Sequence, residues 1–148
     1  MSKPQVIVVG SYVQDHAWTT EQFPSAGESR IGTFTTGPGG KGFNQAVACH
    51  RQGVDTLFIG AIGNDHLGTT AQNFATAEKL PCAWNIRTDK PTAASTITVN
   101  ARGENLIVVA LGANEALSVD FVQAQQSTIQ HARVVLAQLE CNLAATRT

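Results

Sequence analysis

Charged side chains are scarce in this sequence: they make up 14% of the 148 residues, and the formal net charge is −1. No block of lysine and arginine occurs, which argues against a surface built to bind nucleic acid. Apolar residues nevertheless account for 43% of the chain, a share typical of a folded globular domain rather than a disordered one. A compact domain of this length buries roughly 68–70% of its unfolded surface, enough to form a hydrophobic core.

Cysteine is also rare, with three residues that lie far apart and show no Cys-x-x-Cys spacing (Cys49, Cys82 and Cys141). This pattern favours reduced thiols over a disulfide framework or a zinc site, so no metal ligand is predicted in the chain. Long apolar runs are missing as well, because the run from Val6 to Val9 is too short for a signal-peptide core and no membrane-spanning stretch follows. We therefore expect a cytoplasmic protein that has no membrane partner.

What remains along the chain is a succession of strand-like and helix-like patterns. Three continuous apolar runs are typical of buried parallel strands, at residues 5–9, 56–59 and 133–139. Three segments are predicted to be helical, at residues 44–52, 66–79 and 118–130, with Gly53, Asp65 and Ser118 as their capping residues. Short alternating pieces within 17–36 indicate strands off the main sheet, and residues 95–100 and 105–110 indicate a hairpin.

The order of these elements predicts an α/β fold, with a doubly wound, Rossmann-like and mostly parallel sheet and a separate small β appendage. Doubly wound sheets usually have five or more strands, whereas only about four candidates for the main layer occur here. We therefore expect residues 1–148 to be an incomplete part of a single domain.

A glycine-rich loop, residues 37–42, separates the appendage from the first helix and is predicted to be neither helix nor strand. Four glycines in six residues, followed by Asn44 at a helix start, allow backbone N–H groups to approach a ligand closely. The loop is not a P-loop, because Lys41 is followed by Gly42 and Phe43. Nor is it a dinucleotide fingerprint, because it does not directly follow a buried strand. A flexible connection that binds nothing is the alternative interpretation.

Two acidic residues are predicted at the edge of the sheet where open α/β proteins bind ligands. Asp15 lies just beyond the carboxyl end of the first strand, and Glu140 ends the strand at 133–139. A carboxylate at this edge can accept two hydroxyl hydrogen bonds, which suits a polyol such as a sugar. Taken separately, each acid also fits an ordinary role, Asp15 in a solvated turn and Glu140 as a helix cap or surface residue.

The glycine loop and its flanks together resemble the first signature of the ribokinase family of sugar and nucleoside kinases. Matching pieces run through essentially the whole chain: Val-Val-Gly-Ser with Asp15, Phe23-Pro24 with Gly27-Glu28, Gly39 to Ala46 with Gly53 and Gly63, Asn64-Asp65 with Gly68, Gly103-Glu104-Asn105, Gly112-Ala113-Asn114 and Gln138-Leu139-Glu140. The resemblance implies a doubly wound domain whose small β-sheet lid, near 16–36 and 95–110, covers the sugar and pairs two subunits as a homodimer. It also implies that 1–148 is the N-terminal part of one such domain, whose C-terminal half is missing.

The resemblance further implies that the chain supplies the sugar-binding half of an ATP-dependent sugar kinase, with ribose as the first candidate substrate and ribose 5-phosphate as the product. The implied sugar contacts are Val13, Asp15, Gly40, Lys41, Gly42, Asn44 and Glu140. The family's catalytic base is an aspartate in a Gly-Ala-Gly-Asp turn, which this sequence lacks, so no catalytic residue is predicted here and the 148 residues alone are expected to be inactive. The sites for ATP, Mg²⁺ and K⁺ are expected mostly in the other half.

One position departs from the family pattern. Ribokinases usually have asparagine two residues before the aspartate, where Val13 stands here, and an apolar side chain cannot replace the hydrogen bonds of an amide. Loss of one such contact shifts discrimination between sugars by about 1–3 kcal/mol. The neighbouring Gln14 should point the other way if the strand continues. With the bulky Tyr12 and Phe43, Val13 leaves open a kinase for a nucleoside or another sugar, such as fructose; a non-catalytic half-protein that binds a sugar or a partner is an alternative of another class.

Overall fold

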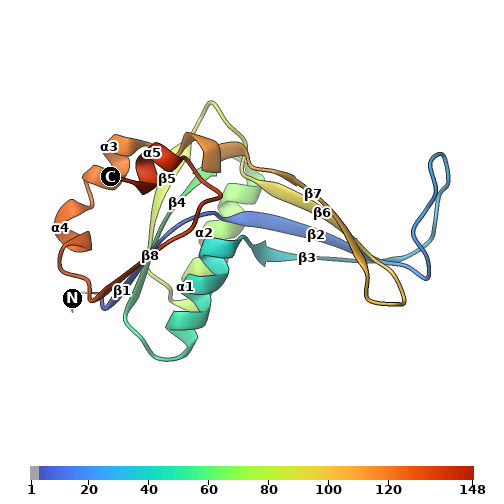
Figure 1. The fold of residues 1–148 in the computed structure, drawn as a ribbon, viewed down its shortest axis with the longest axis horizontal. Helices are drawn as coiled ribbons and strands as arrows, with labels where there is room; N and C mark the ends of the chain where they lie inside the picture. The colour runs from blue at the N-terminus through green and yellow to red at the C-terminus, as the bar shows by residue number, and fades with distance from the viewer. Residues whose placement is uncertain (1–3) are drawn as a thin grey trace.

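The computed structural model describes residues 4–148, which form two four-stranded β-sheets (Figure 1). All strands of the main sheet run parallel, in the order β5-β4-β1-β8. Its strands are β1 (Val6–Val9), β4 (Thr56–Gly63), β5 (Cys82–Arg87) and β8 (Val134–Ala137). The α/β class and the parallel main sheet predicted from the sequence are therefore confirmed.

Helices cover both faces of the main sheet, as the doubly wound prediction requires (Figure 1). On one face, α1 (Lys41–Arg51) and α2 (His66–Glu78) pack against the side chains of Val8, Phe58 and Ile62. The other face is covered by η1 (Gly112–Ala116), α3 (Val119–Gln123), α4 (Gln126–Ile129) and α5 (Leu143–Thr146). Across residues 4–148, none of the helices is both long enough and apolar enough to cross a bilayer.

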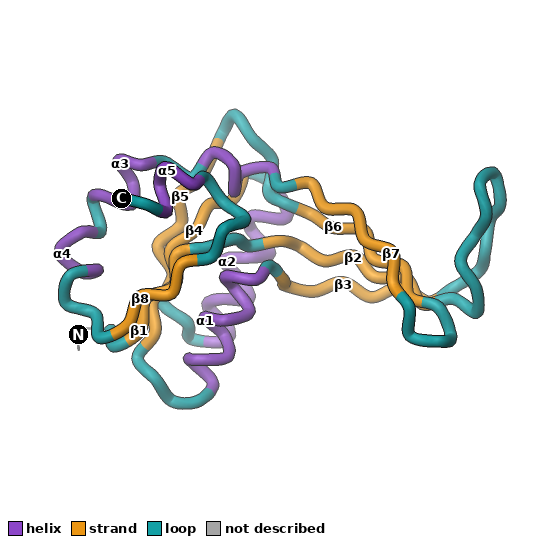
Figure 2. Tube along the Cα trace, viewed as in Figure 1, coloured by secondary structure: helices purple, strands orange, loops and turns teal. Residues whose placement is uncertain are grey.

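The second sheet, which we call the small sheet, projects away from the helices and the main sheet (Figure 2). It has the order β3-β2-β6-β7 and consists of β2 (Val13–Thr19), β3 (Thr33–Gly39), β6 (Ala94–Val99) and β7 (Asn105–Ala110). The central pair β2–β6 is parallel, and the two outer pairs are antiparallel. Both the segment near 16–36 and the 95–110 hairpin thus contribute strands to one appendage.

The glycine-rich segment is where the structure corrects the sequence analysis most. Residues 37–42 were predicted to be neither helix nor strand, but β3 extends through Gly39 and α1 begins at Lys41. Pro38 stands opposite Gln14 in the β2–β3 pair. It is tolerated because β3 is an edge strand, so the missing N–H interrupts no ladder on the outer side. The loop shrinks to Gly40, and the small sheet joins α1 almost directly.

Three other elements differ from the prediction. Strand β5 was not predicted; it lies at the edge of the main sheet and is only half-buried, so its residues lack a continuous apolar run. Strand β8 was predicted to be buried, but it forms the opposite edge and is largely exposed. The single helix expected over 118–130 is two short helices, α3 and α4, with a break at Ala124 and Gln125.

Asp65 caps α2 and also ties that helix to the connection between β5 and β6. Its Oδ1 accepts hydrogen bonds from the Gly68 N–H at 2.8 Å and the Thr92 hydroxyl at 2.7 Å, and its Oδ2 accepts from the Thr92 N–H at 2.7 Å. Partial burial acts to raise the pKa of the Asp65 carboxyl, but these donors outweigh it and lower that pKa below 3.8. The carboxylate therefore stabilises the root of β6 in its ionised form.

We expect Asp65→Asn to reduce the acid sensitivity of the fold. A carboxyl whose folded pKa is depressed contributes stability that is full above the unfolded value and lost as pH falls through the folded value. The wild-type free energy of unfolding should therefore fall below about pH 4, while that of the variant, already lower by about 1–2 kcal/mol at neutral pH, changes less. Urea unfolding between pH 7 and pH 3 measures both slopes, with the exposed Asp120→Asn as control; equal slopes for Asp65→Asn and wild type would contradict the expectation.

Candidate functional site

The chain leaving β1 and the start of α1 lie in direct backbone contact, and this contact is the base of the candidate site. The Phe43 N–H donates to the Ser11 carbonyl at 2.9 Å. Gly40 has a φ of 94°, and a Cβ on it would lie 2.7 Å from the Ser11 carbonyl oxygen and 2.8 Å from the Val13 nitrogen. Only glycine fits this backbone conformation and this approach. Residues 10–13 and 39–42 therefore form one closely packed surface at the carboxyl end of the main sheet.

Asp15 meets this surface at Gly39. Strand β2 carries it there, and the carboxylate lies so close over the Gly39 backbone that any side chain at that position would overlap it. Its Oδ1 accepts a hydrogen bond from the Ser95 hydroxyl of β6 at 2.6 Å. Because Asp15 is only half-buried and one such bond leaves most of its lone pairs open, the carboxylate can still accept hydroxyl groups of a ligand.

Glu140 meets the same surface at Lys41, with which it forms an ion pair. The Ser11 hydroxyl lies 3.3 Å from Glu140 Oε2 and 3.0 Å from Gln138 Oε1, and the Ser11 N–H also donates to Gln138 Oε1 at 3.3 Å. The Lys41 side chain is 70% exposed, so the pair contributes little to stability. Its effect is to place a carboxylate and an ammonium group side by side at the N-terminus of α1.

Asn114 in η1 holds two of these segments together, a role that the sequence analysis missed. Its buried side chain accepts from the Tyr12 N–H at 3.2 Å and donates to the Tyr12 carbonyl at 2.8 Å. Its own backbone carbonyl accepts from the Asn142 N–H at 2.9 Å, two residues beyond Glu140. The motif Gly112-Ala113-Asn114 was noticed as part of the resemblance, but a clamp between distant backbones has no signal in the sequence.

The remaining residues around the site lie on β2 and α1, and along β2 their side chains alternate between the two faces of the strand. Val13 and Asp15 point to one side of β2, and Gln14 points to the other, as expected from its position along the strand. Asn44 lies in the first turn of α1 and is exposed, whereas Gly42 is buried. The structure thus brings six of the seven predicted positions together around residues 10–13 and 39–42, with Asn44 two residues beyond them in the first turn of α1.

Tyr12 and Phe43 do not face this site. Both side chains are 0% exposed, and their rings pack edge to face with centroids 5.1 Å apart in the core beneath the sheet. Trp84 from β5 packs against both of them. The suggestion that these bulky rings favour a nucleoside therefore loses its basis, because neither ring can reach a ligand.

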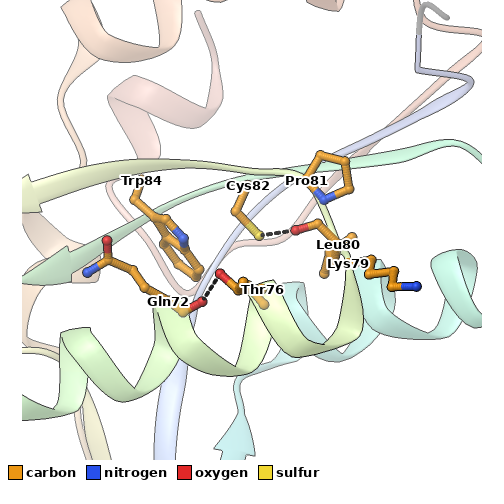
Figure 3. A pocket seen from close by; sticks show the side chains of 8 residues that line it. Gln72, Thr76, Lys79, Leu80, Pro81, Cys82 and Trp84 are labelled. Atoms are coloured by element: carbon orange, nitrogen blue, oxygen red, sulfur yellow. Dashed lines mark hydrogen bonds between the residues drawn. The ribbon is translucent and has the colours of Figure 1, made fainter. Parts of the chain in front are cut away.

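A hollow between α2 and β5 lies apart from the predicted site residues (Figure 3). Several of its polar groups are already used within the fold: Gln72 donates to the Gly68 carbonyl, the Thr76 hydroxyl donates to the Gln72 carbonyl, and the Cys82 thiol lies 3.5 Å from the Leu80 carbonyl. Burial raises the pKa of the Cys82 thiol to about 12, so it is no nucleophile at neutral pH. We assign no ligand to this hollow.

Metal binding can be tested on the donor groups present. Within residues 4–148, no three side chains of histidine, cysteine, aspartate or glutamate gather closely enough to enclose a metal ion. A Mg²⁺ ion at a phosphoryl-transfer site is held by one or two carboxylates together with the phosphates of its substrate. Residues 4–148 therefore form no complete metal site of their own, and a Mg²⁺ ion of this kind would take its remaining ligands from the substrate phosphates.

Comparison with known proteins identifies the class to which this fold and site belong. The family model for pfkB family carbohydrate kinases matches residues 3–144, and the chain belongs to that family. Among its relatives, a ribokinase of Bacillus subtilis is 35% identical over 136 residues, which cover 91% of this chain and 46% of that protein.

Solved structures agree with this placement. A ribokinase from Giardia lamblia superimposes with a TM-score of 0.88 at 32% identity, covering 94% of this chain and 42% of that one. A ribokinase from Arabidopsis thaliana in complex with ribose and ATP superimposes with a TM-score of 0.73 at 28% identity, covering 94% and 46%. The chain therefore spans about half the length of the relatives it matches.

Proposed function

We propose that this chain supplies the sugar site of an ATP-dependent kinase that phosphorylates ribose. The observation that carries the proposal is the joint placement of Asp15 and Glu140 on the packed surface of residues 10–13 and 39–42. Two carboxylates at one place offer several acceptors for the hydroxyl groups of a polyol. Membership in a family of carbohydrate kinases, and relatives that are ribokinases, support ribose as the first substrate to test.

In this proposal the chain's residues bind and orient the sugar. Asp15 and Asn44 hold hydroxyl groups, and Glu140 and Lys41 line the side of the pocket toward α1. Gly40 and Gly42 lack side chains and so let the start of α1 pack directly on residues 10–13 beneath these groups. Transfer of a phosphoryl group would break the bond between the γ-phosphorus of ATP and its bridging oxygen, with ADP leaving, and form a bond to a sugar hydroxyl oxygen, whose proton would pass to the catalytic aspartate expected from the resemblance. The catalytic aspartate of the family and the sites for ATP, Mg²⁺ and K⁺ remain expectations of the resemblance, outside these residues.

Val13 is the residue that bears most directly on which sugar the site binds. Its side chain is on the Asp15 side of β2 and 4% exposed, so it offers packing and no hydrogen bond. A sugar whose hydroxyl faced Val13 would lose one polar contact, worth about 1–3 kcal/mol. Ribose stays the first candidate, and another sugar, such as fructose, is the alternative that Val13 supports.

The test is a substrate panel with the complete gene product, whether or not it extends beyond Thr148. ATP consumption is followed with ribose, fructose and adenosine, and binding of each is measured by calorimetry. We expect turnover with ribose at the highest kcat/KM. Turnover with none of them would refute the kinase proposal, and binding of ribose without turnover would favour a non-catalytic sugar-binding protein.

We further propose that two copies associate through the small sheet. Four consecutive apolar residues of β7, Leu106 to Val109, are 57%, 52%, 74% and 45% exposed. Since neighbouring residues of a strand point to opposite faces, the rest of the chain leaves apolar surface open on both faces of this sheet.

We also propose a cytoplasmic location for this enzyme, which the three free cysteines suit.

Light scattering tests the association directly. We expect the wild-type complete gene product to scatter with twice the mass of one copy. Val108→Lys and Val109→Lys place a charge on opposite faces, and the substitution on the associating face should reduce the mass to one copy because it buries an unpaired ammonium group. A wild-type mass of one copy at millimolar concentration would contradict the proposal.

A further inference from the structure

A continuous series of hydrogen bonds runs from the core to the small sheet, on the face of β2 opposite the Asp15 side chain. The Tyr12 hydroxyl donates to Gln14 Oε1 at 2.6 Å, Gln14 Nε2 donates to the Thr36 hydroxyl at 2.8 Å, and that hydroxyl donates to the Asp15 carbonyl at 2.8 Å. Gln14 is 3% exposed, so its amide is an interior group although it lies where the chain enters the small sheet. The simplest interpretation is that these bonds only satisfy the hydrogen-bonding groups of a buried amide.

In each of these three hydrogen bonds, only one assignment of donor and acceptor is possible. The Asp15 carbonyl cannot donate, so the proton of the Thr36 hydroxyl points to it and the hydroxyl oxygen faces Gln14 as an acceptor. Gln14 must then turn its Nε2 toward Thr36 and its Oε1 toward Tyr12. Burial, and then the nearby Asp15 carboxylate, raise the pKa of the Tyr12 hydroxyl, which stays a donor at neutral pH. A single arrangement of the amide therefore satisfies all partners.

The two residues at the ends of this hydrogen-bond series, Tyr12 and Thr36, differ in how tightly they are packed. The Tyr12 ring is 0% exposed and held by Phe43 and Trp84, whereas Thr36 is exposed on the edge strand β3. The Gln14 N–H adds a third tie, to the carbonyl of Ala93 immediately before β6, at 2.9 Å. Gln14 thus connects the packed core with the middle of β3 and with the residue that precedes β6, close to where the small sheet meets the rest of the fold (Figure 2).

We propose that Gln14 is a positioning residue that fixes the small sheet, and with it the Asp15 carboxylate, relative to the surface formed by residues 10–13 and 39–42. It touches no ligand itself, because its side chain lies on the other side of β2 from Asp15. The proposed effect on sugar binding rests on the function proposed above, whereas the effect on the small sheet does not. An apolar side chain of equal length would fill the same space but would remove the side-chain bonds to Tyr12 and Thr36, so that backbone pairing with β2 alone would set the position of β3.

Gln14→Met is the variant that separates these roles, with Gln72→Met as the matched control because Gln72 bonds only within α2. Thr36→Val provides a second variant at an exposed position where failure to fold is not a concern. Two quantities are measured on the complete gene product: hydrogen exchange of backbone amides by mass spectrometry, and the affinity for D-ribose by calorimetry.

We expect Gln14→Met and Thr36→Val to speed exchange by about tenfold in residues 13–19 and 33–39, with α2 and β4 unchanged. The affinity for D-ribose should fall by about tenfold in the same two variants and stay constant in Gln72→Met. Wild-type exchange in both segments would overturn the proposal, even if the melting temperature fell. If the wild type bound no ribose, the sugar kinase proposal would fail, and the exchange result would still decide whether Gln14 positions the small sheet.

Discussion

Replacing Asp15 by asparagine is expected to weaken ribose binding by about 100-fold while the fold persists. The substitution keeps the shape of the side chain and an acceptor for the Ser95 hydroxyl, but it removes the negative charge that strengthens bonds from sugar hydroxyls. A hydrogen bond to a charged group contributes about 1.5–3 kcal/mol and one between neutral groups about 0.5–1.5 kcal/mol, so weakening two such bonds accounts for the expected loss of about 2–3 kcal/mol. Calorimetric titration of the complete gene product with D-ribose measures the effect.

The exposed Asp120→Asn is the matched control for this experiment, because it removes the same charge from the first turn of α3. Ribose affinity in this control should equal that of the wild type. The free energy of unfolding of Asp15→Asn should fall by no more than about 1 kcal/mol, since the bond from the Ser95 hydroxyl keeps an acceptor and loses only the charge of that acceptor. Unchanged ribose affinity in Asp15→Asn would remove Asp15 from the sugar site.

A single methyl group at Gly42 is expected to disrupt the site by pushing the start of α1 away from residues 10–13. A Cβ there would lie 2.7 Å from both Gly10 Cα and the Ser11 nitrogen, whereas carbon contacts favour about 3.5–4.0 Å. Alanine is the better helix former by about 1 kcal/mol, but this gain is smaller than the cost of overpacking two backbones, about 3 kcal/mol. The start of α1 must therefore move away from residues 10–13.

We expect Gly42→Ala to lower the free energy of unfolding by about 2 kcal/mol and kcat/KM for ribose by on the order of 100-fold, because a shift of roughly 1 Å misplaces Lys41 and Gly40. Urea unfolding and steady-state kinetics measure the two effects. Gly37→Ala is the control: a Cβ there meets nothing within 4 Å, so stability and activity should stay near wild type. If the two variants behaved alike, close packing at Gly42 would have no functional importance.

Much of the architecture could be predicted because local patterns agree with the final fold. The apolar run that forms β1 and the Asp65 cap that begins α2 were predicted from the sequence and are confirmed. The failures lie where tertiary position overrides local preference. Strand β3 continues through Gly37, Pro38 and Gly39 because β2 offers it a partner, although those residues taken alone favour a turn. Strand β5 was missed because an edge strand needs no continuous apolar run.

The site shows the same division. Asp15, Glu140 and the glycines were identified from the sequence, because their types and spacings resemble a family signature and because acids after parallel strands gather at one sheet edge. The residues that hold them in place, Asn114 and Gln14, were not assigned such a role. An asparagine or glutamine becomes a clamp only when distant backbones arrive on both sides of it, and the sequence carries no record of that encounter.

The sequence by itself therefore determined the class of fold, the small β appendage and the chemical groups available for a sugar. The tertiary structure alone decided how these groups are arranged: which acid meets which end of the glycine segment, why Tyr12 and Phe43 belong to the core, and how the small sheet is fixed to the rest. The physical reason is the range of the interactions. Periodicity and capping act between residues a few positions apart, whereas the contacts of Ser11 with Gln138 and of Tyr12 with Asn114 join segments more than 100 positions apart, and these exist only in the folded chain.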